Sequence, residues 1–227
     1  MFLKFYDKLT QRLNGAGEWL APIGLRLLLA WEFWQAGVLK FRDPGGNVSG
    51  FHEGLDFAFP FGIFPAGLNF FLVTWGELLA AIALVLGLFT RFFAFVLLAI
   101  TTVAIASVHW PESWASLGQL MEGYSVSRVV EDGEFRGNFR IPFLFLAMLM
   151  PLFFMGGGKL SMDYLLTRLT RDDSLPDRDV TDANAFGIAA LVFGLVAIYL
   201  IPSWGIILLL ISAGLFIYAR VRQAPAS

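Results

Sequence analysis

The run from Asn69 to Phe89 constrains this chain more than any other stretch, because it is almost wholly apolar and long enough to cross a bilayer. It carries a single carboxylate, Glu77, in its interior. A carboxylate in the middle of a membrane span costs roughly a few kcal/mol unless it faces protein or water. The run therefore predicts a transmembrane helix whose acidic residue needs either a partner or a function.

The composition extends this prediction to the whole chain. Hydrophobic residues make up 57% of the 227 residues, charged residues make up 15%, and the mean hydropathy is +0.69. A soluble domain of this length would expose far too much apolar surface, so we predict an all-α integral membrane protein. The net charge of −2 leaves no basic surface for nucleic acid.

The absence of cysteine restricts the redox chemistry that the chain itself can carry. A thiol–disulfide relay, an iron–sulfur cluster held by cysteines and a thiolate metal site all need thiolate groups. Any redox reaction here must therefore use a bound cofactor, a quinone or a partner subunit.

Hydropathy predicts six membrane-spanning helices, over residues 20–41, 69–89, 92–109, 139–158, 185–201 and 203–219. The first four helices form a predicted four-helix core over residues 20–166. The last two form a C-terminal hairpin over residues 185–219, joined to the core by a cytoplasmic linker over residues 167–184. Pro202 predicts the turn of the hairpin, and two small faces predict close helix packing there, Gly194 with Ala190 and Gly205 with Gly214.

The basic residues predict how the chain is oriented in the membrane. Residues 1–17 place apolar side chains on one helical face and Lys4, Lys8 and Arg12 on the other, which predicts an amphipathic helix on the inner membrane surface, ended by Gly15 and Gly17. A frayed, solvated tail is the alternative. With this end inside, the cytoplasmic segments hold about twice as many basic residues as the outer loops, so both termini are predicted to be cytoplasmic in a bacterial-type inner (plasma) membrane.

Two outer loops are predicted to offer surface to a partner. The loop over residues 42–68 is rich in phenylalanine and proline, and we expect it to dip into the headgroup region and roof the bundle. The loop over residues 110–138 is polar, so it is either a docking surface for another protein or an ordinary solvated loop. A homo-oligomer is left open.

The buried polar residues indicate a candidate site. Glu32 and Gln35 lie in the outer half of the first predicted span, one turn apart, and Glu32 and Glu77 reach similar depths. Two carboxylates at one depth either share a proton or pair with a cation. Arg26 lies about a turn or more deeper than both, so its position permits a salt bridge to Glu77 but does not require one.

These residues predict an outward-facing pocket around Glu77, floored by Trp31, Trp34 and Trp75. Such a pocket suits a quinone head group, whose ring stacks on tryptophan while histidine and carboxylate exchange hydrogen bonds and protons with its oxygens. The residues with predicted roles are Glu77 as proton acceptor, His109 as hydrogen-bond donor, Arg26, Glu32 and Gln35 as polar support, and Trp34 and Trp75 as stacking walls.

Structural roles are the alternatives for each of these residues. Glu77 would then tie helices together as a paired or protonated group, and His109 would be a hydrogen-bonded histidine at a helix end. A metal site built from His52, His109, Glu32 and Glu77 is disfavoured, since no paired-histidine spacing occurs, and we predict no metal. The glycines at 156–158 end a transmembrane helix and predict a C-cap and hinge.

Three ordered motifs give the chain a resemblance to the DoxX family of membrane proteins over about residues 20–166. They are Arg26 followed by Phe33-Trp34-Gln35-Ala36-Gly37-Val38-Leu39-Lys40-Phe41, Glu77 followed by Leu86-Gly87-Leu88-Phe89-Thr90-Arg91, and Gly156-Gly157-Gly158-Lys159-Leu160-Ser161-Met162-Asp163. The His109-Trp110 pair and the long loop after it are similar to the longer DoxX proteins found beside peptide-modification genes of the bufferin type. The hairpin departs from the family's usual four-helix plan.

The resemblance implies a four-helix transmembrane core and an oxidoreductase or oxidoreductase subunit. Some DoxX proteins form the membrane part of thiosulfate:quinone oxidoreductase, and others belong to oxidative-stress complexes. We therefore expect an inner-membrane redox-associated protein that binds quinone, or supports a quinone-linked partner, around Glu77. The alternatives are a non-catalytic membrane scaffold or chaperone for a partner protein or modified peptide and, less favoured, a small-solute transporter.

Overall fold

The structure is a computed structural model. It describes residues 2–43, 47–55, 57, 59–111, 113–125, 130–131, 134–135, 138–170 and 181–223. The chain divides into two compact units, Met1–Arg171 and Asp172–Ser227, which are described separately here.

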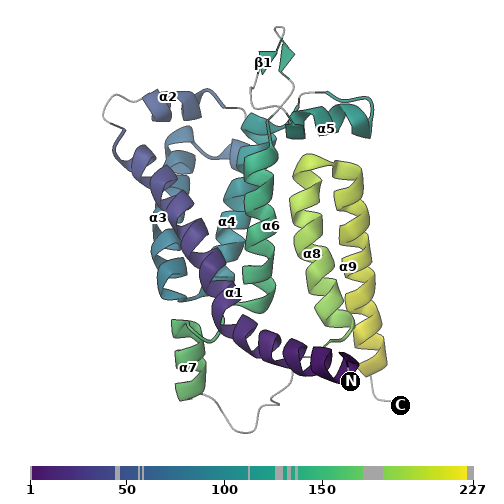
Figure 1. Ribbon diagram of the computed structural model, residues 1–227. Helices are drawn as coiled ribbons and strands as arrows, with labels where there is room; N and C mark the ends of the chain where they lie inside the picture. The colour runs from purple at the N-terminus through teal and green to yellow at the C-terminus, as the bar shows by residue number, and fades with distance from the viewer. Residues whose placement is uncertain are drawn as a thin grey trace. The chain divides into compact units, whose positions relative to one another are not determined.

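The first unit is built on four long helices: α1 (Phe2–Phe41), α3 (Ala66–Leu86), α4 (Thr90–Ala104) and α6 (Arg140–Met155). Helix α1 packs on α3, α3 on α4, α4 on α6, and α6 on α1, so the four helices close into a bundle (Figure 1). The predicted four-helix core is therefore confirmed.

Small residues let α1 and α3 approach closely. A Cβ atom added at Gly37 of α1 would lie 2.8 Å from Cγ of Leu78 on α3, and Ala80 is fully buried. Large apolar side chains lie on the outside of the bundle, where Ile82 of α3 and Phe92 of α4 are exposed. An apolar exterior over a close-packed interior is what a bundle surrounded by lipid requires.

Within the described residues, four helices are long and apolar enough to cross a membrane: Ala66–Leu86, Thr90–His109, Ala183–Leu200 and Pro202–Arg222. Helix α6 is apolar but shorter, and the predicted span 20–41 lies inside α1. Each of the six predicted spans therefore coincides with a helix, and the chain is a multi-pass membrane protein.

Short elements cover the two ends of the bundle (Figure 1). Helix α7 (Met162–Thr170) lies at the same end as the first turns of α1. The elements of the two loops that were predicted to be outer lie at the opposite end: α2 (Asn47–Glu53), the 3₁₀ turn η1 (Phe61–Ile63), α5 (Leu117–Ser125), and the strands β1 (Val130–Glu131) and β2 (Glu134–Phe135). The two strands pair antiparallel, with Val130 opposite Phe135.

The predicted N-terminal amphipathic helix is not separate from the first span, because both belong to α1. Helix α1 continues through Gly15, Gly17 and Pro22 to Phe41, so the predicted stop at the two glycines is wrong. A glycine inside a helix costs only about 1 kcal/mol relative to alanine, and it ends a helix when it adopts a left-handed conformation, which neither glycine does. Figure 1 shows the first part of α1 at a wide angle to the rest. Its position on the membrane surface stays a prediction.

The loop after α6 contains the predicted glycine C-cap. Gly156 has a φ of 82°, and its N–H donates to the carbonyl oxygen of Leu152 at 2.9 Å. The predicted C-cap is therefore confirmed. The predicted linker over residues 167–184 begins inside α7, and residues 171–180 of that linker lie outside the described part of the chain.

The second unit is a helical hairpin of α8 (Ala183–Leu200) and α9 (Pro202–Gln223), as predicted. The carboxylate of Asp182 caps the start of α8 by accepting from the N–H of Ala185 at 2.9 Å. Ile201 separates the two helices, so Pro202 begins α9 where its missing N–H is not needed.

Glycine contacts hold the hairpin together at Gly194 and Gly205, and a Cβ atom at Gly194 would lie 2.9 Å from the Leu209 side chain. A Cβ atom at Gly205 would lie 2.4 Å from the backbone of Ile198, which leaves room only for glycine. Gly214 has nothing within 4 Å of its Cβ position, so its predicted packing role in the hairpin is wrong. Gly205 and Gly214 are nine positions apart, about half a turn out of phase, and face different sides of α9.

Candidate functional site

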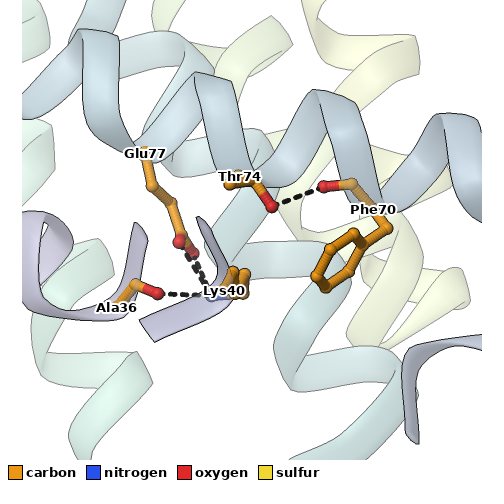
Figure 2. Close-up of polar contacts among 5 residues, drawn as sticks. All are labelled: Ala36, Lys40, Phe70, Thr74 and Glu77. Atoms are coloured by element: carbon orange, nitrogen blue, oxygen red, sulfur yellow. Dashed lines mark hydrogen bonds and ion pairs between the residues drawn. The ribbon is translucent and has the colours of Figure 1, made fainter. Parts of the chain in front are cut away.

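The carboxylate of Glu77 forms an ion pair with Lys40. Figure 2 shows Lys40 Nζ between the two oxygens, at 2.9 Å from Oε1 and 2.7 Å from Oε2. The side chain of Glu77 is 6% exposed and that of Lys40 is 18% exposed. Of the two arrangements predicted for this carboxylate, the structure has pairing with a cation.

Lys40 is the partner of Glu77, a role that the sequence analysis did not name. It lies in the last turn of α1, and its Nζ also donates to the carbonyl oxygen of Ala36 at 3.5 Å. The sequence did indicate this partner, since Lys40 is the basic residue at the end of the span that precedes Glu77. Lysine carries its charge on a long stem, so a helix-end lysine can reach back to a carboxylate deeper in the bundle.

The close approach of α1 and α3 makes this pair possible. The Cβ position of Gly37, one turn before Lys40, lies 3.3 Å from Cβ of Glu77. A larger residue at position 37 would push α1 away from α3 and move Lys40 Nζ away from the carboxylate.

A histidine of helix α2 packs against α3, the helix that carries Glu77. His52 of α2 is buried, and its ring packs against Phe57 at 5.1 Å and Phe70 at 5.5 Å between ring centroids. Burial, and then the positive charge of Lys40, lower the pKa of His52, which favours the neutral imidazole. Among the described residues, its Nε2 has no hydrogen-bond partner.

Two polar residues of α3 accompany this histidine. Asn69 donates from Nδ2 to the carbonyl oxygen of Phe61 at 2.9 Å, while its buried Oδ1 has no partner in the part of the chain that the structure describes. Thr74 donates to the carbonyl oxygen of Phe70 at 2.7 Å (Figure 2). An ammonium, a carboxylate, a neutral imidazole and an amide thus line the outer part of α3. Such a set can exchange hydrogen bonds and protons with an oxygen-bearing ligand.

Arg26 lies at the other end of the bundle. It is 2% exposed, and its guanidinium donates to four backbone carbonyl oxygens at 2.7–2.9 Å, those of Leu84, Val85, Gly157 and Leu160. Leu84 is seven residues from Glu77, or roughly 10 Å along α3. These bonds tie α1 to the end of α3 and to the loop after α6. They give Arg26 a structural role, and its predicted role in ligand binding stays a prediction.

His109 contacts Asn138, and no bond between His109 and Glu77 is present among the described residues. It ends the π-helical turn η2 (Ile105–His109), its Nδ1 lies 2.5 Å from Oδ1 of Asn138, and its carbonyl oxygen accepts from the Asn138 N–H at 3.0 Å. The contacts join the end of α4 to the start of α6. The geometry is that of the alternative weighed above, a hydrogen-bonded histidine at a helix end.

The predicted tryptophan walls divide between two places. Trp31 and Trp34, both exposed, line an open pocket of about 350 Å³ on the outside of the bundle between α1 and α3, whose α3 wall includes Ala81 and Val85. Trp75 packs instead against Phe41 and Phe71, at 5.7 and 6.2 Å between ring centroids. Glu32 and Gln35 are exposed on α1 and do not line the pocket.

The comparisons with known proteins agree with this architecture. The family model described as DoxX matches residues 21–110, which run from α1 to just past η2 and include Lys40, His52 and Glu77. The chain is 31% identical over 159 residues to a protein of Haemophilus influenzae described as "Uncharacterized protein". The aligned region covers 70% of this chain and 91% of that protein. No solved structure matches the chain. With a DoxX match over three of the four bundle helices and a relative aligned along nearly its full length, the chain belongs to the DoxX family.

Proposed function

We propose that this protein binds a quinone-type redox carrier at the Lys40–Glu77 pair, as a membrane subunit that supports a quinone-linked oxidoreductase. The observation that carries the proposal is the ion pair itself, whose carboxylate is buried two turns along α3 from Phe70, the residue on which His52 packs. Ionisable residues within membrane spans commonly mark proton or substrate sites. Tying two helices together does not need a charged pair, because apolar residues of similar size do so at equal or lower cost.

The pair suits the proton side of quinone chemistry. Reduction of a quinone to a quinol takes up protons on its oxygens, and a hydrogen-bonded ammonium and carboxylate can hold and pass a proton at those atoms. The electrons would come from a partner protein, since the chain has no cysteine with which to hold an iron–sulfur cluster or run a thiol relay.

The apolar pocket between α1 and α3 supports the same proposal. Its α3 wall begins at Ala81, one turn from Glu77, and its α1 wall includes Trp31 and Trp34. An apolar pocket of this size suits the ring or the isoprenoid tail of a membrane carrier.

Tryptophan fluorescence tests the proposal directly. The purified protein in detergent would be titrated with a short-chain quinone, because a quinone bound near Trp31 and Trp34 quenches their emission. We expect saturable quenching in the wild type and its loss in Glu77→Gln. The matched control is Glu32→Gln, which removes an exposed carboxylate of α1 and should leave the titration unchanged.

Loss of quenching must be distinguished from loss of folding, so the thermal unfolding of each variant is measured. The double variant Lys40→Glu/Glu77→Lys is included because it keeps an ion pair between the two positions while it exchanges the positive and the negative side chain. Loss of saturable quenching in folded Glu77→Gln protein supports the proposal. Linear quenching in the wild type, or wild-type titration in the folded Gln variant, contradicts it.

A further inference from the structure

Two buried polar atoms at the outer end of α3 have no partner among the described residues: His52 Nε2 and Asn69 Oδ1. His52 is 9% exposed and Asn69 is 4% exposed. A buried polar atom without a hydrogen bond costs about 1–3 kcal/mol, so native proteins leave few of them, and those that remain mark a bound water, an ion or a functional group.

Both residues belong to one place in the fold. The ring of His52 packs on Phe70, which follows Asn69 in α3, and the Asn69 amide holds the carbonyl oxygen of Phe61 in η1. Helix α2, the turn η1 and the outer end of α3 therefore meet at these two side chains.

This place continues the Lys40–Glu77 site outward. The His52 ring packs on Phe70, which is seven residues, or roughly 10 Å along α3, from Glu77. Asn69 is eight residues from Glu77, roughly 12 Å along α3 and within about 80° of it around the helix. Phe70, on which His52 packs, lies with Thr74 and Glu77 on one side of α3 (Figure 2).

We infer that His52 and Asn69 form the outer, hydrogen-bonding end of the ligand site and bind an oxygen substituent of the quinone-type carrier. The Oδ1 atom of Asn69 accepts from a hydroxyl group. The Nε2 atom of His52 donates to a carbonyl oxygen in one tautomer and accepts from a hydroxyl in the other, so it can bind both the oxidised and the reduced carrier. The rings of Phe57 and Phe70 beside the imidazole provide aromatic surface for a planar head group. This inference rests on the proposed function.

The chain offers a clean test because it contains only two histidines. Protein labelled with ¹⁵N-histidine and held in detergent gives ring-nitrogen NMR signals from His52 and His109 alone. His109 is tied to Asn138 and serves as an internal control. Titration with a short-chain benzoquinone should shift the His52 signals saturably, with the same half-saturation as the tryptophan quenching, and leave the His109 signals in place.

Two variants sharpen the test. His52→Gln assigns the signals, and His52→Phe keeps an aromatic ring against Phe70 but removes the nitrogen. We expect His52→Phe to weaken benzoquinone binding at least tenfold while it unfolds near the wild-type temperature. Asn69→Leu should weaken binding in the same direction.

The outcomes separate this inference from the proposed function. If wild-type quenching saturates and is lost in Glu77→Gln, while the His52 signals stay fixed or His52→Phe binds as well as the wild type, the inference is overturned and the proposed function stands. A shift at His109 without one at His52 also overturns it. If wild-type quenching never saturates, the proposed function fails and the inference fails with it.

Discussion

Lys40 at the end of α1 and Glu77 in α3 form a bidentate ion pair, with both carboxylate oxygens within 2.9 Å of one ammonium nitrogen. The pair exists because Gly37 lets the two helices touch one turn away. It therefore joins two features of the molecule, the close helix contact that builds the bundle and the charged group around which a ligand site is proposed.

Removing one member of the pair should cost more than removing both. Lys40→Met leaves a buried carboxylate without its cation, and breaking a buried pair in this way typically costs about 3–5 kcal/mol. The double variant Lys40→Met/Glu77→Met should recover most of that loss. Thermal unfolding of the wild type, both single variants and the double variant in one detergent measures the coupling. Additive losses would mean that the two side chains do not stabilise each other.

Arg26 should be sensitive even to lysine. Lysine keeps the positive charge, but its single nitrogen cannot reach the four carbonyl oxygens that the guanidinium binds. We expect Arg26→Lys to lower the free energy of unfolding by at least about 2 kcal/mol, since hydrogen bonds of charged groups contribute about 1.5–3 kcal/mol each. Arg91→Lys is the comparison, because its bonds to Phe153 and Phe154 are exposed. Equal losses of unfolding free energy in the two variants would contradict the proposal that Arg26 ties α1 to α3 and to the loop after α6.

Two glycines of α9 should respond oppositely to alanine. A methyl group at Gly205 meets the backbone of Ile198 at 2.4 Å, which cannot move aside, so Gly205→Ala should destabilise the hairpin by about 1–3 kcal/mol. Gly214 has open space around it, so Gly214→Ala should be neutral or stabilising by up to about 1 kcal/mol. The rate of proteolysis between α8 and α9 in detergent reports hairpin opening. Similar rates in the two variants would show that the hairpin is packed differently.

The stability of the protein should fall at acidic pH in a way that depends on His52. Burial, and then Lys40, hold the pKa of His52 below its ordinary value of about 6.5, so the unfolded chain binds more protons than the native protein as the pH drops. The contribution of the neutral imidazole is complete above about pH 6.5 and is lost as the pH falls through the folded-state pKa. Melting temperatures at about pH 7.5 and about pH 5 should differ more in the wild type than in His52→Gln. An equal drop in both proteins would assign the effect to other groups.

The absence of cysteine makes the predicted topology easy to measure. Single variants Ala115→Cys, in the predicted second outer loop, and Thr167→Cys, in α7, place thiols at exposed positions. If the termini are cytoplasmic, a membrane-impermeant maleimide should label Ala115→Cys in intact spheroplasts and Thr167→Cys only after lysis. The reverse pattern would invert the orientation in the membrane.

Much of the fold could be predicted from the sequence because it depends on local patterns. Apolar runs of sufficient length fix where helices cross the membrane, Pro202 separates the last two, and Gly156 caps the fourth span. The failure at Gly15 and Gly17 is also local in origin. A glycine ends a helix only where the residues after it are more stable in another conformation. Here the residues after Gly17 are more stable as helix, because they continue into a span that packs on α3.

The candidate site depended on contacts between helices, and these decided what the sequence could not. Glu77 was identifiable because a lone carboxylate in an apolar run is costly wherever it lies. Its partner was not, because Lys40, Arg26 and His109 all lie within reach of the bundle, and only the packing of the helices selects among them. In the structure, Arg26 donates to backbone carbonyl oxygens, His109 is hydrogen-bonded to Asn138, and Lys40 forms the ion pair with Glu77. The sequence thus determined which segments form membrane-spanning helices, through hydropathy along the chain, but it placed the exposed Glu32 and Gln35 among the buried groups. The tertiary structure decided which side chains meet, because helix rotation and close approach at Gly37 set the distances between them.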